Sequence, residues 1–338
     1  MKQTDVSAKR CLYVTSGWGV HDERWVSALR SVGFDPLVFS LGRDASTLDD
    51  LRALVEEATL SPTPVLAGPL TSITRSLVGV DAHLVGLSWG FDLHELEEAG
   101  DLGWLALVDG LIVDSKATQV IAETAGVPGS RITMLPWGVD LEQFTPDGPL
   151  ADLTQYGIPA GAQVVLSARA HEPLYRVADV IEGFAAIADQ LPHAHLLITH
   201  EGSLTSGLEK LAQDLAVSAR IHFIGKVAEA DLPSIMRASS CYVSATSVDG
   251  TSVTLLQAMA CRVPVVASAC PGNLGWVTDR DTGRTFPVSD TQKLGMRLQD
   301  ALTKSDLTLI DGAFARVQNA ADWNLNISVL KQALTPTP

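Results

Sequence analysis

The sequence predicts an α/β protein made of two doubly wound parallel sheets. Short apolar runs alternate with amphipathic stretches along both halves of the 338-residue chain, which is the pattern of parallel sheets covered by helices on both faces. A stretch rich in proline and glycine, residues 144–161, separates the two halves. The hydrophobic content of 46% and the charged content of 19% supply enough apolar material for two cores. This composition excludes a disordered chain or a fibre.

Buried strands are expected where the apolar residues form short runs. These runs are residues 12–15, 35–40, 64–67, 84–88 and 110–113 in the first half, and 163–167, 195–199, 221–224, 241–244 and 263–267 in the second. Amphipathic stretches such as residues 22–32 and 117–125 are the expected helices. The repeated pattern predicts two Rossmann-like domains, at residues 1–148 and 149–318. Because ligands of such sheets bind beyond the carboxyl ends of the strands, we expect a central cleft between the domains to hold the ligand.

The charge distribution limits the partners. The net charge is −15, and residues 1–150 carry 10 basic against 21 acidic side chains. An acidic first half repels nucleic acids and anionic lipid surfaces, so we expect no nucleic-acid partner. The alternative is that the acidic excess serves solubility alone.

The cysteine spacing and the hydropathy of the sequence indicate the cellular location of the protein and whether it binds a metal. The first ten residues are polar, and no run approaches the roughly 18 apolar residues that a membrane helix needs. The four cysteines lack zinc-like spacing. We therefore expect a cytoplasmic protein with no stable membrane insertion and no metal site.

The most informative segment is SVDGTSVTLLQAMA at residues 247–260. After a strand that ends near Ser244, Asp249 and Gly250 make a turn, and Thr251 or Ser252 can cap a new helix. Free backbone N–H groups at such a helix start form an anion site suited to a diphosphate. Gln257 lies about two turns further along the same face. An ordinary capped helix is the alternative from spacing alone.

Further segments make the chain resemble a known family. They are AMACRVPVVAS at residues 258–268, the loop CPGNLGWV at 270–277, PWGVDLEQF at 136–144, AR at 168–169, IHFIG at 221–225, AGPL at 67–70 and SWGFD at 88–92. Taken in their order along the chain, they resemble the retaining glycosyltransferases of family 4, across roughly residues 12–325. The resemblance implies the GT-B fold, with a C-terminal helix at residues 319–334 that crosses back to the N-terminal domain.

The resemblance implies a nucleoside-diphosphate sugar as donor, with UDP or GDP expected and no other cofactor. Arg169 and Asp249 would be the catalytic residues: Arg169 would neutralise the phosphates, and Asp249 would contact the donor sugar. Backbone N–H groups near the new helix would hold the diphosphate, and Gln257 would bind the ribose. The complete set of implied donor-binding residues is Gly17, Gly19, Arg169, Arg176, Gly202, Gly225, Lys226, Val227, Asp249, Gly250, Thr251, Ser252, Val253 and Gln257.

The sequence departs from the family pattern at four points. Asp249 and Gln257 replace the two glutamates of an E-x7-E motif, and Trp89 stands where the family often has histidine. Arg176 is the candidate replacement for a lysine, and the segment HEG at residues 200–202 replaces G-x-G. Because Trp89 has a single N–H donor, a donor sugar without an ordinary 6-hydroxymethyl group, or one bound in another pose, is a hypothesis.

Acceptor residues are expected in the loops that follow the strands of the first domain. They are Trp18, His21, Asp22, Trp89 and Asp92. Aromatic faces stack on sugars or flat rings in such sites, whereas packing of the tryptophans and a helix-start role for His21 are the simpler alternatives.

We therefore expect a metal-independent retaining glycosyltransferase whose acceptor is a soluble small molecule or glycan, presented through a hydroxyl or an amine. The alternatives are polysaccharide or glycolipid assembly and a non-catalytic sugar-nucleotide-binding protein. An oxidoreductase is disfavoured, because no G-x-G-x-x-G follows the first strand.

Overall fold

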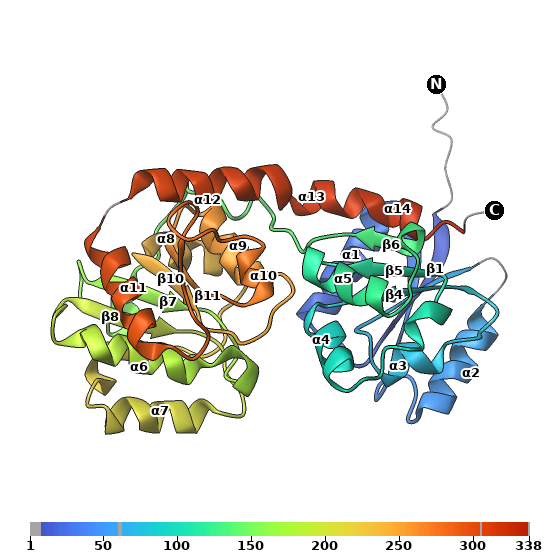
Figure 1. The fold of residues 1–338 in the computed structure, drawn as a ribbon, viewed down its shortest axis with the longest axis horizontal. Helices are drawn as coiled ribbons and strands as arrows, with labels where there is room; N and C mark the ends of the chain where they lie inside the picture. The colour runs from blue at the N-terminus through green and yellow to red at the C-terminus, as the bar shows by residue number, and fades with distance from the viewer. Residues whose placement is uncertain (1–7, 60–62, 305, 337–338) are drawn as a thin grey trace. The chain divides into compact units, whose positions relative to one another are not determined.

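The computed structural model of the protein describes residues 8–59, 63–304 and 306–336 (Figure 1). The chain forms two compact units. The first combines the chain up to Pro136 with the segment from Asn324 onward, and the second spans Trp137–Trp323.

The first unit is built on a parallel sheet with strand order β2-β1-β3-β4-β5-β6. Its register places Leu12 of β1 beside Leu37 of β2 and Val65 of β3. The strands are β1 (Lys9–Thr15), β2 (Phe34–Ser40), β3 (Pro64–Ala67), β4 (His83–Leu87), β5 (Gly110–Val113) and β6 (Ile132–Met134). The helices are α1 (Val20–Ser31), α2 (Leu48–Ala58), α3 (Ser72–Ser76), α4 (Phe91–Glu98), α5 (Lys116–Thr124) and, from the end of the chain, α14 (Leu330–Ala333).

The second unit repeats this plan with the strand order β12-β11-β10-β7-β8-β9, again parallel. Its strands are β7 (Gln163–Ser167), β8 (Ala194–Ile198), β9 (Ile221–Phe223), β10 (Cys241–Ser244), β11 (Val265–Ser268) and β12 (Arg284–Phe286). Its helices are α6 (Val177–Ala188), α7 (Thr205–Asp214), α8 (Leu232–Ala238), α9 (Val253–Ala260), α10 (Pro271–Leu274), α11 (Thr291–Thr303) and α12 (Leu307–Ala320), and α13 (Trp323–Asn326) follows.

The apolar runs of the second unit are buried on both faces of its sheet. Along β7, Val164 and Leu166 belong to one hydrophobic cluster, which includes Leu255 of α9. Val165, between them, belongs to the other cluster, which includes Phe184 of α6. Because successive side chains of a strand point to opposite faces, both faces are covered, as the sequence predicted.

The boundaries between the compact units lie after residues 136 and 323. The sequence pattern predicted domain boundaries after residues 148 and 318. Packing explains the difference at the first boundary. Val139 and Phe144 lie in a core cluster of the second unit, and Arg237 donates to the carbonyl oxygens of Thr145 and Pro149 at 3.1 and 3.0 Å. The segment that reads as a linker is therefore part of the second unit.

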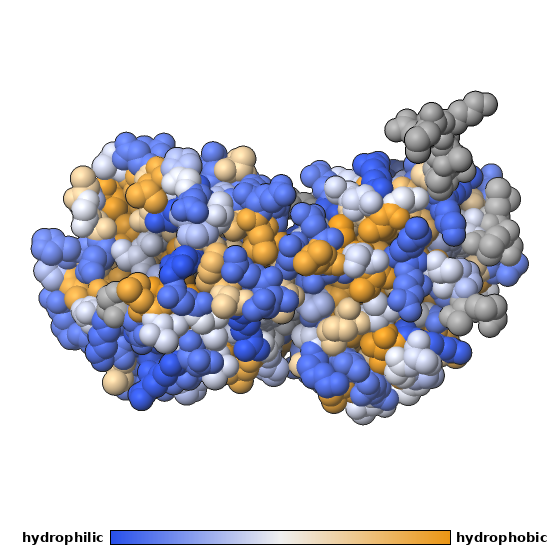
Figure 2. Space-filling model, turned by 90° about the horizontal axis from the view of Figure 1, so that it is seen from above, coloured by the Kyte–Doolittle hydropathy of each residue, from blue (hydrophilic) through white to orange (hydrophobic). Residues whose placement is uncertain are grey.

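The face drawn in Figure 2 is mostly hydrophilic, with hydrophobic residues in small groups between the charged ones. Across the described residues, none of the helices combines the length and the apolar character required to cross a bilayer.

Candidate active site

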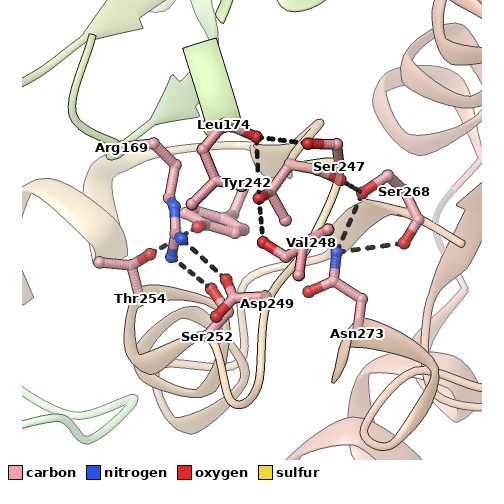
Figure 3. A network of polar contacts seen from close by, with 11 residues as sticks. Arg169, Leu174, Tyr242, Ser247, Val248, Asp249, Ser252, Thr254, Ser268 and Asn273 are labelled. Atoms are coloured by element: carbon pink, nitrogen blue, oxygen red, sulfur yellow. Dashed lines mark hydrogen bonds and ion pairs between the residues drawn. The ribbon is translucent and has the colours of Figure 1, made fainter. Parts of the chain in front are cut away.

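The centre of the candidate site is the buried guanidinium of Arg169, which follows β7. Its Nη2 donates to Asp249 Oδ2 at 2.7 Å and its Nη1 donates to Ser252 Oγ at 2.8 Å. The Tyr175 ring lies against the guanidinium, with Cζ 4.2 Å from the ring centroid. Nε is buried and has no hydrogen-bond partner. Two predicted catalytic residues, far apart in the sequence, thus meet at the carboxyl end of the second sheet (Figure 3).

Electrostatics hold this arginine in its charged form. Burial alone would lower the pKa of Arg169, but the nearby Asp249 carboxylate, with Tyr242 and Tyr175, raises it above its ordinary value. The pair is largely removed from water, since the side chains are 11% and 13% exposed.

The loop that carries Asp249 is fixed by hydrogen bonds to its neighbours (Figure 3). The Leu174 carbonyl accepts from the backbone N–H of Ser247 at 3.0 Å and from its hydroxyl at 3.1 Å. Ser268 Oγ donates to the Thr246 carbonyl at 2.5 Å, and Asn273 Nδ2 donates to Ser268 Oγ at 3.1 Å. The loop after β10 is therefore tied to the loop after β7 and to α10.

Helix α9 begins beside this loop. Of the two expected capping residues, Thr251 and Ser252, the N-cap position is occupied by Ser252. The Ser252 side chain forms no cap hydrogen bond, and its hydroxyl oxygen accepts from Arg169. Thr251, Ser252 and Gly250 are buried, and Val253 opens the helix. The first backbone N–H groups of a helix have no intrahelical partner, so this end can accept an anion.

Three glycines allow close contacts around the site. A Cβ at Gly202 would lie 2.5 Å from the His171 carbonyl oxygen, and one at Gly272 would overlap the backbone of Asp249. Gly225 has φ +69°, and its carbonyl accepts from His200 N at 2.7 Å. These contacts join the loop after β8 to the loops after β7 and β9, and the loop after β10 to α10.

The remaining predicted donor residues of the second unit occupy varied surroundings. Gln257 is 7% exposed, and its Oε1 is buried without a hydrogen-bond partner. Arg176 forms a two-pronged pair with Asp179, at 2.7 and 3.0 Å. Lys226 is exposed, and Val227 is partly buried against the core. The charge of Arg176 is thus already paired, whereas Gln257 retains an unused acceptor.

The predicted residues of the first unit lie in the loops after β1 and β4. Trp18 is 42% exposed, donates to Glu23 at 3.3 Å and faces the Arg43 guanidinium. Exposed His21 and half-buried Trp89 meet edge to face, with ring centroids 5.4 Å apart. Gly17 accepts from the Thr15 hydroxyl, and Gly19 is the N-cap of α1. Because both glycines belong to the first unit, their part in donor binding stays a prediction.

Asp22 and Asp92 are buried and accept hydrogen bonds from neighbouring groups of the first unit. Asp22 accepts from the Tyr13 hydroxyl at 3.0 Å and from Gly19 N at 2.8 Å. Asp92 accepts from the Ser88 hydroxyl and from backbone N–H groups of Leu70, Trp89 and Leu93, at 2.6–3.0 Å. Burial raises the pKa of Asp92, although these hydrogen bonds oppose the shift. Both carboxylates position the loops that carry Trp18 and Trp89.

Sequence reasoning missed several residues that build the site. Tyr242 Oη shares a 2.7 Å hydrogen bond with Thr254 Oγ1, and Asn273 connects α10 to β11. Asn273 lies in the Gly-Asn loop, which was a usable signal. Tyr242 lies inside an apolar run, where its hydroxyl gave no sign of a polar role. Among the described residues there is no cluster of three or more metal-ligating side chains; the expected absence of a metal stays a prediction.

Two Rossmann-like units of this topology define the GT-B class of fold, and solved structures share it. The chain matches the Anabaena protein HepE, solved with UDP and glucose, with a TM-score of 0.77 and 16% identity over 95% of this chain and 90% of that one. It also matches sucrose-phosphate synthase from Thermosynechococcus elongatus, with a TM-score of 0.77 and 17% identity over 96% of this chain and 98% of that one.

The sequence comparisons agree with this class of fold. Residues 151–310, just under half of the chain, match the family described as "Glycosyl transferases group 1". The predicted resemblance is confirmed.

Curated relatives carry more specific names. The D-inositol 3-phosphate glycosyltransferase of Mycobacteroides abscessus is 31% identical over 54% of this chain and 42% of its own length. A GDP-mannose-dependent monoacylated alpha-(1-6)-phosphatidylinositol monomannoside mannosyltransferase of Corynebacterium glutamicum is 29% identical over 66% of this chain and 71% of its own. The match therefore spans less than half of the first relative.

Proposed function

We propose that the protein is a glycosyltransferase that moves a sugar from a nucleoside-diphosphate sugar to a soluble small-molecule acceptor. The observation that carries the proposal is the buried Arg169 guanidinium, which lies at the start of α9 and keeps an unpartnered Nε. A buried cation beside a helix N-terminus is suited to a diphosphate. The family of residues 151–310 supports this interpretation.

The chemistry follows from the leaving group. As the bond from the anomeric carbon to the phosphate oxygen breaks, positive charge grows on the sugar and negative charge on the diphosphate. Arg169 and the first N–H groups of α9 are fixed before the reaction, so they stabilise that negative charge without reorganising. The Asp249 carboxylate accepts a hydrogen bond from Arg169 and would contact the donor sugar. We propose that the transfer proceeds with retention and without a metal.

The donor nucleotide is proposed to be UDP or GDP. HepE was solved with UDP, and the Corynebacterium relative is named for GDP-mannose. The unpartnered Oε1 of Gln257 is an acceptor that a ribose hydroxyl would satisfy.

The acceptor proposal rests on the first unit. Its exposed Trp18 and His21 offer surfaces on which a small ring can stack. The acidic first half of the chain favours a neutral or amine-bearing acceptor over an anionic lipid. Glycolipid assembly is the second candidate, because the Corynebacterium relative is named for a phosphatidylinositol mannoside.

The first test measures melting temperature with UDP, GDP, ADP and TDP, without added metal. A nucleotide at about 100 times its dissociation constant should stabilise the protein by roughly 2.7 kcal/mol. The nucleotide that binds selects sugar donors for transfer assays with inositol, inositol phosphate, amino sugars and phosphatidylinositol vesicles as acceptors. Arg169→Ala should abolish the nucleotide effect, whereas Lys210→Ala, which removes an exposed charge on α7, should retain it. A wild-type protein that binds no nucleotide and transfers no sugar contradicts the proposal.

A further inference from the structure

The strongest unexplained contact in the site is the pair between Arg169 and Asp249. Of the five N–H donors of the guanidinium, one is given to Asp249 and one to Ser252, while Nε is buried without a partner. A carboxylate that contacts a donor sugar has no need to touch the phosphate-binding arginine. The Asp249 carboxylate therefore occupies the guanidinium that we expect to bind the diphosphate of the donor.

Burial explains why this contact forms. A guanidinium removed from water is costly unless a negative group is close to it. Asp249 supplies that group at 2.7 Å, and it raises the pKa of Arg169 against the effect of burial. The Tyr175 ring covers one face of the guanidinium, so the approach of water is restricted further.

The backbone around Asp249 is held in place independently of this pair. Ser247 is bonded to the Leu174 carbonyl, and Gly272 packs against the Asp249 backbone. Rotation of the Asp249 side chain can therefore separate the carboxylate from Arg169 while the loop keeps its position.

We propose that Asp249 is an internal competitor for the donor's diphosphate. Without a donor, its carboxylate neutralises Arg169; when a diphosphate binds, the phosphate oxygens replace the carboxylate, and Asp249 is released toward the sugar. A diphosphate has more acceptor oxygens and more negative charge than one carboxylate, so the exchange selects strongly anionic donors. The inference rests on the proposed function, because it concerns the same donor site.

The test uses inorganic pyrophosphate and calorimetry on the full chain. Asp249→Asn removes the competing charge, so this variant should bind pyrophosphate at least about fivefold more tightly than the wild type. Asp249→Glu keeps the charge and should remain within about twofold. Glu182→Gln, which removes one exposed charge from α6 of the same unit, is the charge-matched control and should also remain within about twofold. Equal or weaker binding by Asp249→Asn overturns the inference.

A second measurement does not depend on whether that variant folds. In a crystal structure of the wild type with pyrophosphate, the anion should contact Arg169, and the contact between Arg169 and Asp249 should be broken. Pyrophosphate bound at Arg169 with that contact intact overturns the inference.

Sugar transfer by the wild type is assayed separately, so the two proposals can fail separately. Transfer without a gain in affinity for Asp249→Asn overturns the competition alone. A gain in affinity without sugar transfer supports the competition and contradicts the proposed function.

Discussion

Gly272 packs so closely against Asp249 that a Cβ at position 272 would overlap the Asp249 carbonyl oxygen. The neighbouring Gly250 carbonyl lies in the same path. Only glycine lets α10 approach the loop that carries Asp249, so residue 272 fixes where the carboxylate is presented.

Gly272→Ala should therefore displace this loop and weaken nucleotide binding by about tenfold or more. Overpacking of this kind costs about 1–3 kcal/mol of stability, which urea unfolding measures alongside binding by calorimetry. Gly207→Ala in α7 is the control, because a Cβ there meets nothing within 4 Å. An unchanged nucleotide affinity in Gly272→Ala would refute the role of this contact.

Arg169→Lys tests the shape of the cation rather than its charge. Lysine lacks the planar fork that bonds both Ser252 and Asp249 and that lies over the Tyr175 ring. We expect nucleoside-diphosphate affinity to fall by about tenfold or more although the charge is kept. Calorimetry on the lysine variant measures this, and wild-type affinity would mean that charge alone suffices.

Asp92→Asn tests the inward role of a predicted acceptor residue. An amide has one acceptor oxygen where the carboxylate has two, so N–H groups among Leu70, Trp89 and Leu93 lose their acceptor. Stability should fall by about 1–3 kcal/mol for a buried donor left without a partner. Asp101→Asn, which breaks an exposed pair with Arg75, should cost at most about 1 kcal/mol in the same urea titration.

The His195–His222 pair predicts how stability depends on pH. Nδ1 of His195 and Nε2 of His222 are 2.9 Å apart, and burial lowers the pKa of both rings below 6.5. The unfolded chain therefore binds more protons as pH falls, so the contribution to stability is present above pH 6.5 and is lost below it. Urea unfolding between about pH 5 and pH 7.5 should show this loss.

The double variant His195→Leu with His222→Leu should lose less stability over that range, because the two rings that gain protons on unfolding are gone. Part of the loss should remain, since His171 and His200, whose pKa values are also lowered, are present in both proteins. An identical pH dependence in the wild type and the double variant would exclude the pair as its source.

The sequence predicted the interior of both sheets well. Four strands, β3, β5, β7 and β10, have the predicted bounds, because each is an apolar run buried on both faces. Strands β6 and β12 were missed. Both are three residues long and lie at sheet edges, where polar residues such as Thr133 and Arg284 interrupt the apolar run.

The grouping of the site residues was predictable where those residues belong to short segments of the sequence. Arg169, Asp249 and Ser252 were placed in it, and the structure brings them together. The pairing of Arg176 with Asp179 was not foreseen, although the two residues are three apart at a helix start. The inward turn of Asp22 and Asp92 depends on distant partners such as Tyr13 and Leu70, which spacing along the chain does not reveal.

The return of the chain to the first unit has a consequence for synthesis on the ribosome. Residues from Asn324 onward complete that unit: Leu330 and Leu334 are buried, α14 contacts β5, and the Ala333 carbonyl lies 3.4 Å from His83 Nε2. The unit whose translation begins first is therefore finished last, after the whole second unit has emerged. During that interval the surface that receives α14 stays uncovered, and a nascent chain stalled before residue 324 exposes it to chaperones and proteases.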